Sequence, residues 1–109
     1  MANCNGCGEE SDRKSETVPV GKYAANKFGL KNTAGNVWEW TQDCWHRSYE
    51  GAPDDGQGWG QADDDDCSRR ALRGGSWNNE PHDVRSAFRY RTAPNTRGSY
   101  LGFRVARSR

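Results

Sequence analysis

The stretch from Gly29 to Trp40, GLKNTAGNVWEW, constrains this chain more than any other segment. It places one acid, Glu39, between two indole rings. A carboxylate among large apolar rings costs free energy unless a positive group pairs with it. The sequence offers two kinds of partner for this carboxylate. One is a bound metal ion, and the other is an arginine from late in the chain, such as Arg73 or Arg104.

The spacing of oxygen donors before Glu39 favours a metal. In an extended segment alternate groups face the same way, so the backbone carbonyls of Gly35 and Val37 can point to the same place as the Glu39 carboxylate. Asn32 lies one turn earlier and can add an amide oxygen. Mixed sets of carbonyl and carboxylate oxygens suit calcium. The spacing therefore makes calcium a candidate beside the arginine.

The core must be built from aromatic side chains. Leu, Val and Phe together number 11 of 109 residues and Ile is absent, a proportion typical of disordered chains. Five Trp, four Tyr and a net charge of only +1 argue for a folded chain, because aromatic rings bury large areas. With 13 Gly and 4 Pro, we expect a single domain that is rich in turns and irregular backbone.

Four segments are predicted to be short strands. Residues Val37–Thr41 are β-prone by residue type, and Ser68–Trp77 predicts a strand that ends in a Gly-Gly bend. Val84–Arg91 alternates with period two, and Tyr100–Ala106 predicts a last strand. We expect little helix and long loops between these strands.

Residues 1–17 are polar and predict an irregular N-terminal arm, which leaves residues 18–109 as the folded domain. The arm contains Cys4 and Cys7, which could close a small disulfide or supply half of a zinc site. Cys44 and Cys67 bracket a loop rich in Gly and Asp, and a disulfide between them would clamp its base. In a reducing cytosol they would remain thiols.

Charge is distributed unevenly along the chain. Residues 1–67 carry 6 basic and 13 acidic side chains, whereas residues 68–109 carry 10 arginines and 2 acids. Internal pairing of the two halves explains this pattern better than a nucleic-acid surface does. The acidic run Asp63–Asp66 is typical of a solvated face. No stretch is apolar enough for a signal peptide or a membrane span, so we expect a cytoplasmic chain with no membrane partner.

Three motifs in order, GLKNTAGNVWEW, SRRALRGGSW and RSAFRYRTAPNTRGSYLGFRVAR, resemble the formylglycine-generating (sulfatase-modifying factor) family over about residues 17–107. The resemblance implies a bacterial protein with a C-type-lectin-like fold of the α+β class, mostly irregular with short antiparallel strands. Domains of this family are usually longer, so the chain would correspond to a truncated, C-terminal part. The exposed sheet edges of such a part would favour a homodimer.

The same resemblance implies a metal site and bears on the family's copper chemistry. Its calcium ligands fall on the side chains of Asn32 and Glu39 and on the backbone oxygens of Gly35 and Val37. The family's oxidases hold copper with two cysteines placed after the RGGSW strand. The matching region here, Asn78–Arg91, contains no cysteine. We therefore expect structural calcium and no copper. The alternative is an enzyme that another chain completes: an oxidase that converts a sulfatase cysteine to formylglycine, or a related oxygenase.

The C-terminal part also resembles the variable ligand-binding proteins of diversity-generating retroelements. Their variable surface positions correspond here to mixed Tyr, Asn, Ser and His, residue types that suit an adaptable binding surface. Phe88 and Tyr90 could equally be core residues. We expect no catalytic residues, and a calcium-stabilised, lectin-like module that binds a protein, peptide or glycan. Its candidate contacts are Asn79, His82, Asp83, Phe88, Tyr90, Thr92, Asn95, Thr96, Ser99 and Tyr100.

Overall fold

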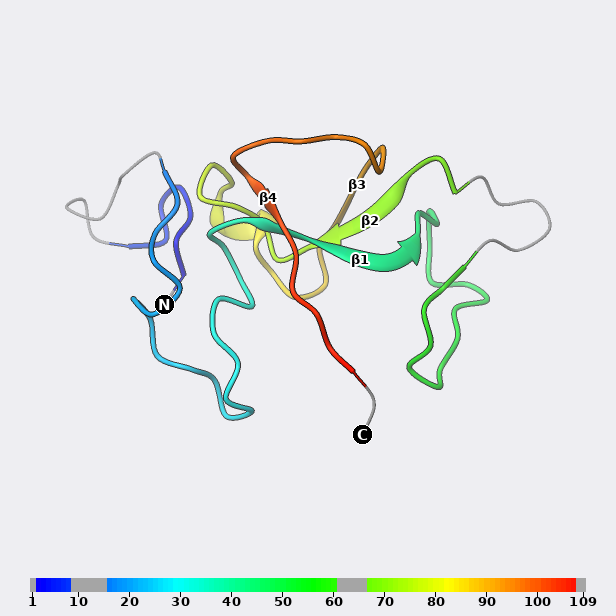
Figure 1. Ribbon diagram of the computed structural model, residues 1–109, viewed down its shortest axis with the longest axis horizontal. Coiled ribbons are helices and arrows are strands. Elements are labelled where there is room, and N and C mark those ends of the chain that lie inside the picture. The colour runs from blue at the N-terminus through cyan, green and yellow to red at the C-terminus, as the bar shows by residue number, and fades with distance from the viewer. Residues whose placement is uncertain (1, 9–15, 61–66, 108–109) are drawn as a thin grey trace.

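A small curled sheet forms the centre of the molecule (Figure 1). The computed structural model describes residues 2–8, 16–60 and 67–107. The expected acidic face at Asp63–Asp66 lies outside these ranges. The four strands follow the order β3-β2-β1-β4 across the sheet. Their bounds are Trp38–Cys44 for β1, Arg70–Arg73 for β2, Arg89–Thr92 for β3 and Leu101–Gly102 for β4.

The two inner strands supply most of the core. β2 pairs antiparallel with β1 and, on its other side, antiparallel with β3. Consecutive residues Ala71 and Leu72 are 2% and 0% exposed, so β2 is buried on both of its faces. Trp38 and Cys44, at the two ends of β1, are also buried. The expected aromatic core is only partly present, because Trp38 is the one aromatic among the buried hydrophobic residues that the structure describes, beside Leu72, Ala71 and two cysteines.

The long loop after β1 is closed at its base by a disulfide between Cys44 and Cys67, with the two Cα atoms 5.0 Å apart. Within the loop, the rings of His46 and Trp59 stack with their centroids 3.6 Å apart. The Trp59 amide donates to the Asp43 carboxylate at 2.7 Å, and the Cys44 amide donates to the Trp59 carbonyl at 2.9 Å. These contacts fold residues 45–60 back on the end of β1.

Three strand predictions were too long. The strand expected within Ser68–Trp77 covers only Arg70–Arg73. Residues 84–88 form a turn, in which the Phe88 amide donates to the Arg85 carbonyl at 3.0 Å, and the strand starts only at Arg89. The last strand has two residues, and Phe103, which follows it, is 76% exposed.

The expected strand arrangement also needs correction. β4 runs parallel to β1, with Trp38 opposite Leu101 and Glu39 opposite Gly102, although only antiparallel strands were expected. The α part of the expected α+β class is small, since the described residues contain one 3-10 turn at Pro81–Asp83 and no α-helix. Within the same ranges, no helix is long and apolar enough to cross a membrane.

The N-terminal segment is irregular, but it is packed against the domain. Cys4 and Cys7 form a second disulfide, with the Cα atoms 5.1 Å apart. Asn3 is 5% exposed and forms a parallel bridge with Gly35. A Cβ on Gly35, whose φ is +75°, would lie 2.5 Å from the Asn3 carbonyl oxygen. Only glycine allows this close approach of two backbones.

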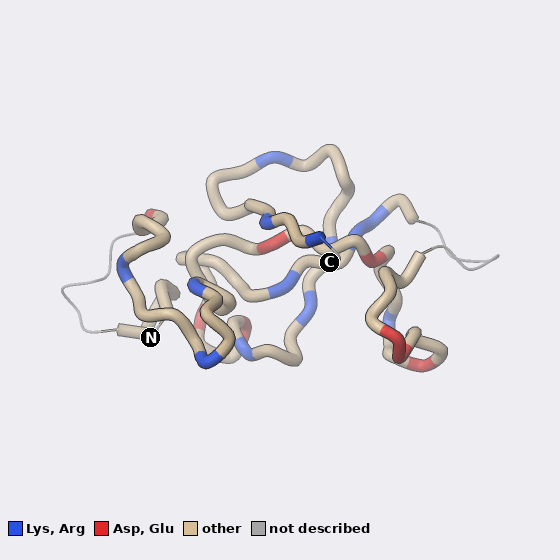
Figure 2. Tube along the Cα trace, turned by 60° about the horizontal axis from the view of Figure 1, so that its bottom comes forward, with Lys and Arg blue, Asp and Glu red and all other residues tan. Residues whose placement is uncertain are grey.

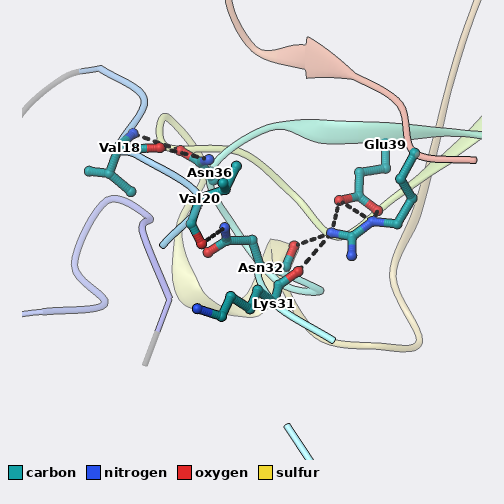
Figure 3. A network of polar contacts seen from close by, with 7 residues as sticks. Val18, Val20, Lys31, Asn32, Asn36 and Glu39 are labelled. Carbon is teal, nitrogen blue, oxygen red and sulfur yellow. Dashed lines mark hydrogen bonds and ion pairs between the residues drawn. The ribbon is translucent and has the colours of Figure 1, made fainter. Parts of the chain in front are cut away.

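Asn36 joins three separate parts of the chain, and Figure 3 shows its contact with Val18. Its buried side-chain oxygen accepts from the Val18 amide at 2.8 Å and from the Asn3 side chain at 3.3 Å. Its side-chain nitrogen donates to the Val18 carbonyl at 3.2 Å. Its backbone oxygen accepts from the Trp77 amide at 2.9 Å. With φ at +70°, Asn36 also occupies the left-handed region that Asn tolerates better than most residues.

We predict that Asn36→Ala lowers the free energy of unfolding by about 3 kcal/mol, because it removes buried hydrogen bonds and puts alanine at a positive φ. Asn36→Gly keeps the backbone conformation and should cost about 2 kcal/mol. Denaturant unfolding measures both values, with exposed Asn95→Ala as the control. A cost below about 0.5 kcal/mol for Asn36→Ala would contradict the role of Asn36 as a link between segments.

Candidate functional site

A cavity of about 430 Å³ collects all four predicted calcium ligands. Asn32, Gly35, Val37 and Glu39 line it together, and Arg104 closes it from the C-terminal side. Positive φ values at Asn32, Gly35 and Asn36 curl the backbone that precedes β1. This curl brings together oxygen donors that an extended chain would hold apart. The four predicted ligands do share one cavity, but the extended backbone from which they were predicted is wrong, since the positive φ values curl this segment.

Arg104 is the partner that the structure places on Glu39 (Figure 3). Its Nε donates to both carboxylate oxygens, at 3.0 and 2.9 Å, and its Nη2 donates to Oε1. Nη2 also donates to the carbonyls of Lys31 at 2.9 Å and Asn32 at 3.1 Å. Arg73, the other candidate, instead donates to the Tyr49 hydroxyl and to the Ser86 carbonyl. The acid between two indoles is thus neutralised from the C-terminal tail.

The donor set of this cavity has the chemistry that calcium prefers. The Asn32 side-chain nitrogen donates to the Val20 carbonyl at 3.0 Å, which leaves the amide oxygen as the available ligand atom. The other candidate donors are the Glu39 carboxylate and two backbone carbonyls, and all are hard oxygens. The described part of the chain holds no cluster of three or more His, Cys, Asp and Glu residues. Any calcium site here therefore needs amide and backbone oxygens in addition to the Glu39 carboxylate. Calcium and Arg104 would have to share Glu39 or compete for it.

A second cavity, of about 360 Å³, lies on the other side of β1. Its floor is Trp38, and the rings of Phe88 and Tyr90 pack against this indole at centroid distances of 5.9 and 5.6 Å. Tyr100 comes from the turn before β4. The remaining lining residues belong to the connection between β2 and β3 and are Ser76, Asn78, Asn79 and Asp83.

This cavity brings together five of the ten predicted ligand contacts, namely Asn79, Asp83, Phe88, Tyr90 and Tyr100. The sequence argument missed Trp38, Ser76 and Asn78. Trp38 entered the sequence analysis only as one of the two indoles beside Glu39. Ser76 is buried, and its backbone amide and hydroxyl both donate to the Asn79 side-chain oxygen, at 3.0 and 2.6 Å.

The other five predicted contacts do not line the cavity. His82 is exposed and faces the acids of Glu80 and Asp83. The hydroxyls of Thr92 and Thr96 lie 3.0 Å apart and bind each other. Asn95 and Ser99 are exposed in the loop between β3 and β4.

Arginines late in the chain also pair with aromatic rings, in addition to the pairing of Arg104 with Glu39. The Arg89 guanidinium lies 4.2 Å from the ring centroid of Tyr49 and 4.8 Å from that of Trp45. Arg91 lies 5.1 Å from the Trp45 centroid. The contacts of Arg89 and Arg91 tie β3 to the long loop that follows β1. Basic positions occur along the whole trace, from the N-terminal loops to the C-terminal tail (Figure 2).

The family of sulfatase-modifying factor enzyme 1-like domains matches residues 2–109, and the chain belongs to this family. It is 38% identical, over 87% of its length, to the formylglycine-generating enzyme of Streptomyces coelicolor, and it covers 30% of that enzyme. It is also 38% identical, over 98% of its length, to the serine/threonine-protein kinase pkn1 of Chlamydia caviae, of which it covers 19%.

Two solved structures share the fold. PvdO from Pseudomonas aeruginosa matches with a TM-score of 0.82 and 41% identity over 94% of this chain. Treponema denticola variable protein 1 matches with a TM-score of 0.65 and 33% identity, again over 94% of this chain. The chain spans 37% and 34% of these two proteins, respectively. The likeness therefore establishes the family and fold of this segment, and the activities of the longer proteins do not follow from it.

We predict an energetic coupling of about 1 kcal/mol between Glu39 and Arg104. The estimate is modest because the Arg104 side chain is 42% exposed, although the carboxylate receives more than one hydrogen bond. A double-mutant cycle with Glu39→Gln and Arg104→Gln measures it by denaturant unfolding, with a chelator present so that calcium does not contribute. A coupling near zero would show that the ion pair does not stabilise the fold.

Proposed function

We propose that this chain is a non-catalytic, lectin-like module that binds a protein, peptide or glycan in the cavity above Trp38. The single observation that carries the proposal is that five of the predicted ligand contacts converge on this cavity. Its rings and amides offer both stacking surfaces and hydrogen-bonding groups, which is the usual composition of a binding pocket. The similarity to Treponema denticola variable protein 1 supports the same binding function. The five contacts were predicted from the resemblance of the sequence to variable proteins of this kind.

The alternative is an oxidase that converts a sulfatase cysteine to formylglycine, and the identity to formylglycine-generating enzymes favours it. Such chemistry requires soft thiolate ligands for Cu(I). The four cysteines of this chain form the Cys4–Cys7 and Cys44–Cys67 disulfides. The region after the RGGSW motif, where the family's oxidases carry their copper ligands, contains none. The binding function therefore accounts better for the residues present.

Arrays of peptides and glycans test the binding function. We expect hits whose affinity falls about tenfold or more in Tyr90→Ala and Tyr100→Ala, because both rings line the cavity. Asn95→Ala is the matched control, since Asn95 was predicted as a contact but lies outside the lining. Hits that bind both tyrosine variants as tightly as the unchanged protein would place the ligand elsewhere. Formation of an aldehyde in a CxPxR peptide incubated with the protein and copper would establish the oxidase instead.

We further propose that calcium binds to Asn32, Gly35, Val37 and Glu39 and stabilises the fold. At a calcium concentration 100 times Kd, the free energy of unfolding should rise by about 2.7 kcal/mol. Thermal unfolding after chelation and after calcium re-addition measures this gain. Glu39→Gln should abolish it, whereas Arg104→Gln should retain it because the oxygen donors remain. An equal melting temperature with and without calcium would exclude the site.

A further inference from the structure

We propose that the cavity above Trp38 is selective for an alkylammonium group, either in a free small molecule or on a lysine side chain. The inference rests on the proposed binding function and names the chemical class of its ligand. Four aromatic rings, from Trp38, Phe88, Tyr90 and Tyr100, line the cavity. Among the residues that the structure describes, Asp83 is the only charged one in the lining.

The rings provide the first element of cation recognition. Phe88 and Tyr90 are tilted by 39° and 32° against the Trp38 indole, so the three rings form an angled surface. The faces of aromatic rings carry partial negative charge and attract cations. Because the Trp38 indole is only 4% exposed, the rings that a cation can reach are mainly those of Tyr90 and Tyr100, which are 47% and 39% exposed. Rings alone would also accept a neutral apolar group. The charge of the remaining lining residues therefore decides the selectivity.

Asp83 supplies that charge. Its side chain is only 22% exposed, so water screens it less than a fully exposed carboxylate. One oxygen lies 3.2 Å from His82 Nε2, and the His82 side chain is 65% exposed and can turn into solvent when a ligand arrives. Arg85, whose guanidinium lies 5.9 Å from the Phe88 ring centroid, is not part of the lining. The lining therefore carries a single negative charge, which favours cations and repels anions.

The volume and the other polar groups fit the same class of ligand. A cavity of about 360 Å³ lies within the range of small-molecule pockets. It has room for a methylated ammonium together with a few atoms of its chain. Asn78 can accept or donate hydrogen bonds at the rim, because it is exposed. Contacts of this kind would orient the neutral part of the ligand and leave the charged end to the rings and Asp83.

Choline and its neutral isostere 3,3-dimethyl-1-butanol test the charge selectivity directly. Binding is followed by the indole N–H resonance of Trp38, assigned with Trp38→Phe. We expect choline to shift this resonance with at least about tenfold higher affinity than the isostere. A peptide that carries trimethyllysine and its norleucine counterpart form the second arm. A stronger response to the peptide than to choline would indicate a ligand presented on a protein.

Asp83→Asn should weaken choline binding about tenfold, because a charge-assisted contact is lost. Asp54→Asn, which makes the same change of charge at an exposed loop position, should leave it unchanged. Tyr90→Leu keeps an apolar wall but removes the ring face, and should weaken choline more than the isostere. Equal binding of choline and isostere, or no effect of Asp83→Asn, would overturn the alkylammonium inference. Ligands from the arrays that depend on Tyr90 but carry no cation would do the same, and would leave the binding function intact.

Discussion

The left-handed backbone at Gly35 and Asn36 is the constraint on which both cavities depend. With φ values of +75° and +70°, these residues turn the chain sharply into β1. The turn packs Gly35 against Asn3, and it lets Asn36 bind Val18 and the Trp77 amide. Segments far apart in sequence thereby meet at the start of one strand. A chain with so few aliphatic residues needs such polar links, because its buried apolar area alone is small.

The alternation of side chains along β1 then separates the two cavities. Successive residues of a strand point to opposite faces, and here Val37 and Glu39 line one cavity while Trp38 lines the other. Glu39 between two indoles is therefore less unusual than the sequence suggests, because its neighbours face away from it. Its charge is paired with Arg104 on the face where the oxygen donors gather. The indole of Trp38 is buried on the opposite face, where Phe88 and Tyr90 pack against it.

The sequence predicted local features and failed where long-range geometry decides. The motif around Glu39 gave the shared location of Asn32, Gly35 and Val37, because spacing along one segment determines it. Half of the contacts that the resemblance to known families selected, five of ten, line the second cavity. The parallel pairing of β4 could not be predicted, since it joins two segments that lie more than 60 residues apart in the sequence, Trp38 with Leu101 and Glu39 with Gly102. Nor does composition reveal that a polar N-terminal segment buries Asn3, because this burial depends on the glycine opposite.

The groups that the described residues gather in the second cavity support the proposed binding function. Reaction sites usually join groups that exchange protons, electrons or covalent bonds, and they hold them close together. The cavity above Trp38 instead combines ring faces and amides with a single carboxylate, Asp83. The thiols that could serve redox chemistry are joined in disulfides, one of them clamping the long loop. In the proposed function, the surface over the indole distinguishes ligands by shape and charge, and the turn at Gly35 and Asn36 before β1 positions that surface.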